Sequence, residues 1–198
     1  MELRPIHRFT ANDIIKQNHY SGSINVGTSI SLGIFEDDIL HGVMQLGKAV
    51  NPAGTAKHVE GSKTSDYLEL NRLWISDDLG YNSESKAIGL MFKWIKENRP
   101  EIKWLVSFAD GIEGNCGTIY QATNWIYTGY NTTCGLWVTK DGKKMHQLTA
   151  KDGLPDAKRS TFYRTLYYFT CNLSCFSCNG KTFSSKTISR FFNVINKL

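Results

Sequence analysis

A strand–helix–strand unit between residues 67 and 110 constrains the fold of this chain more than any other feature. Residues 67–75, YLELNRLWI, alternate in the manner of a strand, and residues 103–110, KWLVSFAD, are almost continuously apolar. Between them, apolar residues recur at helical spacing until Pro100. Two strands joined by a long helix need a crossover connection, so we expect them to lie parallel in one sheet.

The rest of the chain predicts further strands on both sides of this unit. In chain order we expect a strand over 1–9, a helix over 10–22 capped by Thr10 or Asn12, a hairpin over 29–47 that turns at 36–38, a long loop over 48–66, the strand–helix–strand unit with its helix capped by Asn82 or Ser83, a helix over 114–125, a hairpin over 126–149 that turns at Asp141-Gly142, and a strand over 160–170. This order predicts an α+β fold with a central mixed sheet, which contains one parallel pair and is flanked by helices.

Positive charge is concentrated near the C-terminal end of the sequence. Residues 1–150 hold 15 basic and 16 acidic residues, whereas residues 151–198 hold 8 basic and 2 acidic ones. A basic segment with interleaved aromatic residues suits a phosphate backbone, and we take Lys158, Arg159 and Arg164 as candidate DNA contacts. A solvated basic tail is the alternative.

The last part of the chain differs from the rest in composition. Residues 171–198 are rich in Cys, Ser and Lys and lack a clear period, so we predict a catalytic domain over 1–170 and a partly irregular tail after it. The sequence also lacks an apolar run of about 20 residues and an apolar leader, which indicates a cytoplasmic protein that does not enter a membrane.

Three polar residues stand inside the strand over 67–75. By simple alternation, Arg72 shares a face with Leu68 and Leu70, while Glu69 and Asn71 point to the other face. A buried guanidinium needs a partner, which is either functional or a structural ion pair.

Asp110 ends the next strand, at the edge where parallel sheets bind ligands. It is a candidate catalytic residue and a candidate partner of Arg72, and Glu69, nearby in the strand over 67–75, is the other candidate partner. Capping the following helix is the alternative role for its carboxylate.

The order of elements resembles the GNAT acyltransferase fold. The segment GNCGTIYQATNWIYTG resembles the part of GNAT enzymes whose tyrosine protonates the leaving thiolate of coenzyme A, which would be Tyr120 here. GNAT enzymes hold the coenzyme pyrophosphate on a glycine-rich loop at a helix start. The matching GYNSESKAIG has no paired glycines, so Ser83 and Ser85 are candidates to bind a donor of acyl-CoA type.

Five segments, NHYSG, YLELNRLWISD, NSESKAI, IKWLVSFAD and IYQATNW, follow one another between about residues 10 and 168. Together they resemble the Mom family of phage DNA-modification proteins. The resemblance implies a GNAT-like enzyme that converts adenine in phage DNA to N6-(carbamoylmethyl)adenine and so shields the DNA from host restriction. With it, the predicted catalytic residues are His19, Tyr20, Glu69, Asn71, Arg72, Ser85, Asp110 and Tyr120.

The resemblance also implies cofactors and partners. The family is associated with iron, and His19 and Tyr20 are candidate Fe(II) ligands because imidazole and phenolate both bind iron. The expected partners are double-stranded DNA with a flipped adenine, an unidentified donor and, as an open alternative, a second copy of the chain.

Two other functions stay open from the sequence. One is a conventional GNAT N-acetyltransferase that acts on a small amine or a protein. The other is a non-catalytic DNA-binding module that uses the basic C-terminal segment, whose DNA binding would depend strongly on salt.

Overall fold

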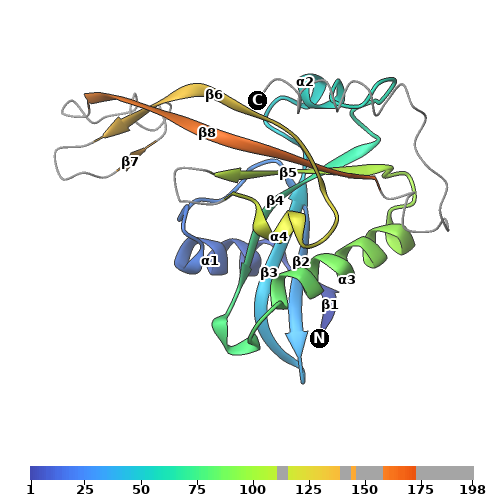
Figure 1. Ribbon diagram of the computed structural model, residues 1–198. Helices are drawn as coiled ribbons and strands as arrows, with labels where there is room; N and C mark the ends of the chain where they lie inside the picture. Colours follow the sequence, from blue (N-terminus) through green and yellow to red (C-terminus); the bar gives the residue numbers. More distant parts are fainter. Residues whose placement is uncertain (111–115, 139–143, 146–157, 173–198) are drawn as a thin grey trace.

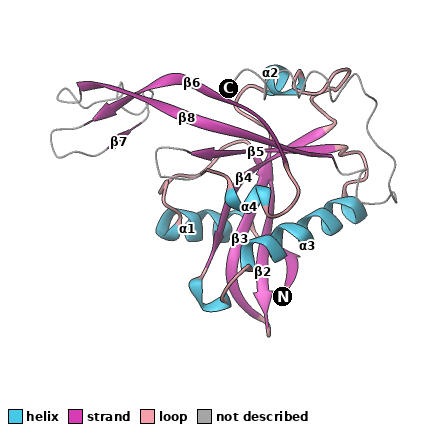
Figure 2. Cartoon of the chain, in the orientation of Figure 1, coloured by secondary structure: helices cyan, strands magenta, loops and turns pink. Residues whose placement is uncertain are grey.

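The computed structural model describes residues 1–110, 116–138, 144–145 and 158–172. Within residues 131–170 it describes the path of the backbone. Figures 1 and 2 show a strongly twisted sheet with helices on its faces. The elements are β1 (Glu2–Pro5), α1 (Arg8–Asn18), β2 (Thr28–Glu36), β3 (Ile39–Gly47), α2 (Pro52–Ala56), β4 (Tyr67–Ile75), η1 (Asp77–Leu79), α3 (Ser83–Asn98), β5 (Trp104–Asp110), α4 (Thr118–Gln121), β6 (Ile126–Val138), β7 (Lys144–Met145) and β8 (Lys158–Asn172).

The strands form one mixed sheet in the order β1-β2-β3-β4-β5-β8-β6-β7. Strands β4 and β5 run parallel, and the other pairs that the structure describes are antiparallel. The predicted α+β fold and its parallel pair are therefore confirmed. The insertion of β8 between β5 and β6 is a long-range pairing that local sequence patterns do not predict.

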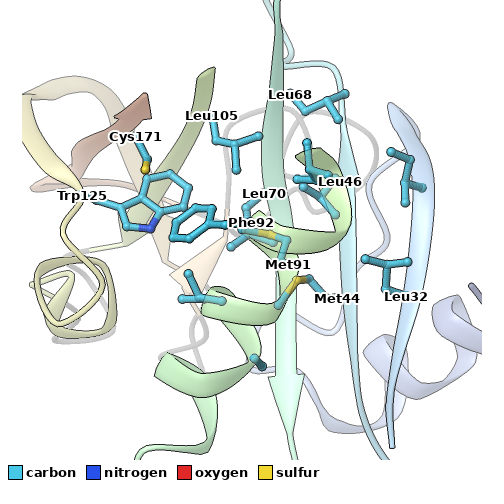
Figure 3. Packing of buried hydrophobic residues seen from close by; sticks show 14 of the residues in the cluster. Leu32, Met44, Leu46, Leu68, Leu70, Met91, Phe92, Leu105, Trp125 and Cys171 are labelled. Atoms are coloured by element: carbon cyan, nitrogen blue, oxygen red, sulfur yellow. The ribbon is translucent and has the colours of Figure 1, made fainter. Parts of the chain in front are cut away.

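Helix α3 covers one face of the sheet. Its apolar stripe packs onto the strands to form the main core, where Met91 and Phe92 meet Leu68, Leu70 and Leu105 (Figure 3). A smaller cluster of Ala11, Ile15 and Val43 holds α1 against the other face. The two helices thus lie on opposite sides of β3 and β4, so a residue on these strands faces one helix or the other.

A β-bulge in β4 changes which residues face which helix. Leu46 of β3 pairs with Leu70, but the neighbouring Gln45 pairs with Arg72, so Asn71 is the extra residue. Leu68 and Leu70 face α3 before the bulge. After it, Leu73 and Ile75 pack on that side, whereas Trp74 packs on the α1 cluster.

The bulge makes one of the sequence predictions wrong. Arg72 pairs with Gln45, whose side chain donates a hydrogen bond to Asn12 of α1 over 2.9 Å. Arg72 therefore lies on the α1 side of the sheet, on the face opposite to that of Leu68 and Leu70. An unbroken alternation does not survive an inserted residue, because each insertion reverses the facing of everything that follows.

Several element boundaries also differ from the predicted ones. Helix α1 begins after His7, whose ring accepts a hydrogen bond from the Phe9 N–H, so the predicted caps Thr10 and Asn12 lie inside the helix. The predicted loop over 48–66 contains the short helix α2, and the predicted helix over 114–125 is regular only in α4. Side-chain caps mark the starts of α1 and α2, at His7 and Asn51.

The predicted turns and the predicted start of α3 are confirmed in part. The first hairpin turns at Asp37-Asp38, where both residues have positive φ, as a two-residue hairpin loop requires. Asn82 stands at the start of α3 in a left-handed conformation and makes no side-chain cap. The predicted turn at Asp141-Gly142 lies outside the described residues.

Two further predictions concern the whole chain. Strand β8 continues to Asn172, and Cys171 is buried in the main core, while the remainder of the predicted tail lies outside the described residues. Among the residues that the structure describes, no helix is long and apolar enough to cross a membrane.

Candidate active site

The candidate site lies where the two parallel strands separate. Strands β4 and β5 pair from Tyr67↔Trp104 only as far as Glu69↔Val106. Beyond this point the Ser107 hydroxyl spans the gap and donates to the Leu70 carbonyl over 3.0 Å. A cavity of about 360 Å³ opens there. Its lining includes six of the eight predicted catalytic residues, namely His19, Tyr20, Asn71, Arg72, Asp110 and Tyr120.

Arg72 connects the bulge to the loop that follows α1. Its Nε donates to the Ser23 carbonyl over 3.1 Å, and one terminal nitrogen lies 3.4 Å from the Ser23 hydroxyl. The other donates to the carbonyl of Asn71 over 2.7 Å. The guanidinium therefore fixes the loop relative to the sheet as well as lining the cavity.

His19 and Tyr20 belong to that loop. The two rings are 4.2 Å apart at 31°, and Tyr20 is 59% exposed at the cavity. Nδ1 of His19 accepts from the Ser21 N–H over 3.1 Å and lies 2.9 Å from the Ser21 hydroxyl. Burial, helped by the positive charge of Arg72, lowers the pKa of His19 to about 4. The imidazole is therefore neutral at physiological pH.

The iron site predicted from His19 and Tyr20 stays a prediction. The described residues contain no group of three His, Cys, Asp or Glu side chains that could hold a metal. We therefore assign no step to iron.

Asp110 lies at the carboxyl end of β5, as predicted. Its side chain is buried, with 7% exposed, and it lines the cavity together with Arg72. The next described helix, α4, starts at Thr118 after Gly117. Residues 111–115 lie outside the described residues, so the alternative capping role of Asp110 stays a prediction.

Glu69 and Asn71 are the buried polar groups beside the bulge, each 7% exposed. Burial raises the pKa of Glu69 to about 6, against the opposing effects of the nearby Asn71 amide and the Arg72 charge. Asn71 lines the cavity, and neither polar atom of its amide makes a hydrogen bond of good geometry in the described part. Glu69 is absent from the cavity lining, but together with burial its charge contributes to the raised pKa of Tyr120, which lines the cavity.

Tyr120 comes from α4 and is buried. Its hydroxyl lies 2.7 Å from the Ser107 hydroxyl. Because a carbonyl only accepts, Ser107 satisfies both contacts when it donates to Leu70 and receives the phenol proton. Burial raises the pKa of Tyr120 to about 12, so the phenol stays protonated at neutral pH. Trp125 packs edge-on against its ring at 5.2 Å.

The two serines predicted to bind a donor lie outside the cavity lining. The Ser83 hydroxyl is within 2.9 Å of the Leu79 carbonyl and 2.6 Å of the Gly80 carbonyl, and the residue is buried. Ser85 is half-buried on α3. Instead, the exposed Glu84 brings a carboxylate from the start of α3 to the cavity.

Comparison with known proteins places these residues in a family. The model of the Mom protein family matches residues 1–171. The chain belongs to the Mom protein family. It is 33% identical over 164 residues to the methylcarbamoylase mom of Escherichia phage Mu, covering 83% of this chain and 67% of that protein. The recognition made from the five sequence segments is confirmed.

Solved structures confirm the GNAT-like fold. A probable acetyltransferase from Staphylococcus epidermidis superposes with a TM-score of 0.50 at 11% identity, over 86% of this chain and 98% of that one. An N-acetyltransferase from Staphylococcus aureus Mu50 gives a TM-score of 0.49 at 10% identity, over 87% and 97%. Membership of the Mom family makes the chain an enzyme of the transferase class.

The predicted DNA contacts are apart from the cavity lining. Lys158, Arg159 and Arg164 lie on β8, in the part that pairs with β6 opposite Val138, Trp137 and Cys134. The structure describes the backbone of this part of the Mom-family fold.

Ser107 and Ser23 are two residues beside the cavity that the sequence analysis missed. Ser107 is the polar residue inside a strand that is otherwise apolar up to the terminal Asp110, and this was the signal for a buried hydroxyl with a specific partner. Ser23 gave no signal, because its contact with Arg72 joins residues 49 positions apart. Its role became visible only when the bulge turned Arg72 toward α1.

Proposed function

We propose that this chain modifies adenine in phage DNA, converting it to N6-(carbamoylmethyl)adenine and thereby protecting the DNA from host restriction. One observation carries the proposal. In a chain of the Mom family, Arg72, Asp110, Tyr20 and His19, from three separate segments, line one cavity at the splayed end of the parallel pair. Its volume of about 360 Å³ lies in the range of about 300–1,000 Å³ for small-molecule sites.

The cavity suits a base that has left the helix. Adenine N6 is paired inside a duplex, so an enzyme that acts on it must flip the base out and hold it by stacking. Tyr20 offers an exposed aromatic face at the cavity, backed by the ring of His19. Stacking of a base on an aromatic ring contributes about 1–3 kcal/mol. We assign Tyr20 to this role and Arg72 to holding the Tyr20 loop through Ser23.

Asp110 is the group that we assign to proton transfer. The N6 lone pair is delocalised into the purine ring, so the amine is a weak nucleophile and gains from a nearby carboxylate that accepts its proton. When N6 attacks the CH2 carbon of the donor, the new N–C bond forms, the leaving group departs with its electron pair, and the N6 proton passes to Asp110. The donor is therefore a molecule with an activated CH2 beside a carboxamide.

The test is nucleoside mass spectrometry. Plasmid DNA is isolated from cells that express the chain, and its adenine nucleosides are compared with those from cells without it. Expected is a new nucleoside heavier than deoxyadenosine by the carbamoylmethyl group. Unmodified adenine in cells that contain folded protein would contradict the proposal.

A conventional N-acetyltransferase is the second candidate, favoured by the fold alone. Coenzyme A carries several negative charges, and the carboxylate of Glu84 stands at the cavity near the start of α3. Like charges repel, so this position disfavours an anionic donor. Tight binding of acetyl-CoA in a calorimetric titration would favour the second candidate over the first.

A further inference from the structure

Strands β6 and β8 continue together past the end of the sheet that carries the cavity. Strand β8 pairs with β5 from Asn172↔Trp104 to Leu166↔Asp110. It pairs with β6 much further, from Thr170 to Lys158. Residues 131–138 and 158–165 therefore form a ribbon of two strands without β5, which we call the arm, and the two-residue strand β7 pairs with β6 at its end. In Figure 1, β6 and β8 run out from the body of the molecule as this arm, with β7 near its far end.

The arm begins beside the cavity. The last residue of β8 that pairs with β5 is Leu166, and its partner is Asp110, the carboxylate assigned to proton transfer. At about 3.4 Å per residue, the next eight residues along β8 extend roughly 27 Å from this point. The arm therefore projects from the edge of the cavity by about the length of eight base pairs of DNA, which rise about 3.4 Å each.

The charge of the arm has one sign. Residues 158–165, KRSTFYRT, contain Lys158, Arg159 and Arg164 and no acid, while residues 131–138, NTTCGLWV, contain no charged residue. The arm thus holds a net charge of +3, more than half of the net +5 of the whole chain. A positive ribbon of this kind is complementary to a polyanion.

We propose that the arm docks in the major groove of duplex DNA, beside the adenine that enters the cavity. The major groove is about 12 Å wide and admits a two-stranded β-ribbon, a shape that several DNA-binding proteins use. Adenine presents its N6 amine in the same groove. An arm in this groove therefore approaches the duplex from the side of the target atom. The groove of duplex RNA is too narrow and deep for such a ribbon.

The first test measures charge contacts. The docking of the arm rests on the proposed function. The test uses the full chain and a short fluorescent DNA duplex, without a donor. The variant replaces Lys158, Arg159 and Arg164 by Gln. Since each phosphate contact contributes about 0.9 to the slope of log K against log salt, the slope should become shallower by up to about 2.7. The matched control replaces Lys86, Lys93 and Lys96 of α3 and should leave the slope unchanged. An unchanged slope in the arm variant would overturn the proposal.

The second test locates the groove. Guanine N7 lies in the major groove, so dimethyl sulfate reports whether bound protein covers it. The wild-type chain should protect guanines near the target adenine, and the arm variant should lose this protection. If protection is absent in the wild type, or persists in the arm variant, the proposed docking of the arm in the major groove is wrong. Nucleoside analysis of the wild type distinguishes failure of the proposed function from failure of the docking proposal. Unmodified adenine contradicts the proposed function itself. Modified adenine without protection of the major groove contradicts only the docking of the arm.

Discussion

The two ends of the parallel pair β4–β5 serve different purposes, although the same two strands form both. At the closed end, Tyr67–Glu69 pair with Trp104–Val106, and the rings of Tyr67 and Trp104 stack at 4.7 Å. At the open end, from Asn71 and Ser107 onward, the strands separate around a cavity. Pairing stops at Glu69, two residues before the extra residue Asn71, so the bulge lies at the boundary between the packed half and the hollow half.

Hydrogen bonding separates the two ends as clearly as packing does. At the closed end, Trp104 donates to the Ser62 hydroxyl over 2.8 Å, and the Tyr67 hydroxyl donates to the Pro52 carbonyl over 3.1 Å. At the open end, the buried Asn71 amide makes no such bond in the described part, and the adjoining Glu69, the last paired residue of β4, has a raised pKa. Polar groups that are costly to bury persist where a ligand can use them, and this contrast supports the proposed site at the open end.

The largest effect is expected for Asp110→Asn. The amide cannot accept the N6 proton, and loss of a general base costs about 10²–10⁴-fold in rate. Mass spectrometry of DNA nucleosides should therefore find little or no modified adenine. The control is Asp66→Asn at the closed end, where the carboxylate pairs with Lys103 over 3.2 Å. Modification per folded molecule should stay normal in this control, and equal losses in both variants would argue against a special role for Asp110.

Trp104→Ala tests the closed end. Removing a buried tryptophan typically lowers the free energy of unfolding by about 3–5 kcal/mol, and here the ring also stacks on Tyr67. Urea unfolding should show this loss, while modification per folded molecule stays close to that of the wild type. A specific loss of activity in fully folded protein would show that the two ends are not separate.

Arg72→Ala should lower modification by about 10²-fold, since the loop with Tyr20 is no longer held to the sheet and misplaced groups cost about this much. Arg72→Lys should recover little, because one ammonium cannot reproduce the three contacts of the guanidinium. Limited proteolysis between residues 19 and 27 tests whether Arg72 holds this loop or acts on the substrate through its charge. If Arg72 holds the loop, cleavage should become faster in both variants. Unchanged cleavage with lost activity would mean that Arg72 acts on the substrate only.

The sequence predicted the parallel pair and the gathering of polar residues at one edge of the sheet, but not the side from which Arg72 arrives. Periodicity shows the crossover, because a 16-residue helix between two strands leaves few connections. It does not show the bulge at Asn71, because the residues on both sides alternate regularly by themselves. The contacts of Arg72 with Ser23 and of Ser107 with Tyr120 depend on three-dimensional pairing, which local patterns do not encode.

Glu69→Gln should give a pH-dependent change in stability. The carboxyl has a pKa of about 6 in the folded chain, above the ordinary 4.5. The folded state thus binds the proton more tightly, and the wild type loses stability as pH rises from 4.5 through 6. The shift corresponds to about 2 kcal/mol. The stability of Glu69→Gln relative to the wild type should rise by this amount between pH 4 and pH 7 in urea unfolding, and a constant difference would contradict the raised pKa.

The smallest effect is expected for Tyr120→Phe, although sequence resemblance suggests a general acid at this position. The phenol proton is bound by Ser107, and Ser107 keeps its bond to the Leu70 carbonyl when the phenol is removed. We therefore expect modification within about tenfold of the wild type, against the 10²–10⁴-fold loss of a true general acid. Ser107→Ala is the companion variant, because it removes the only side chain that spans the gap between β4 and β5 at Leu70 in the described structure. If Tyr120→Phe is inactive while Ser107→Ala is active, the tyrosine proton serves the reaction and the open end holds a second acid–base group.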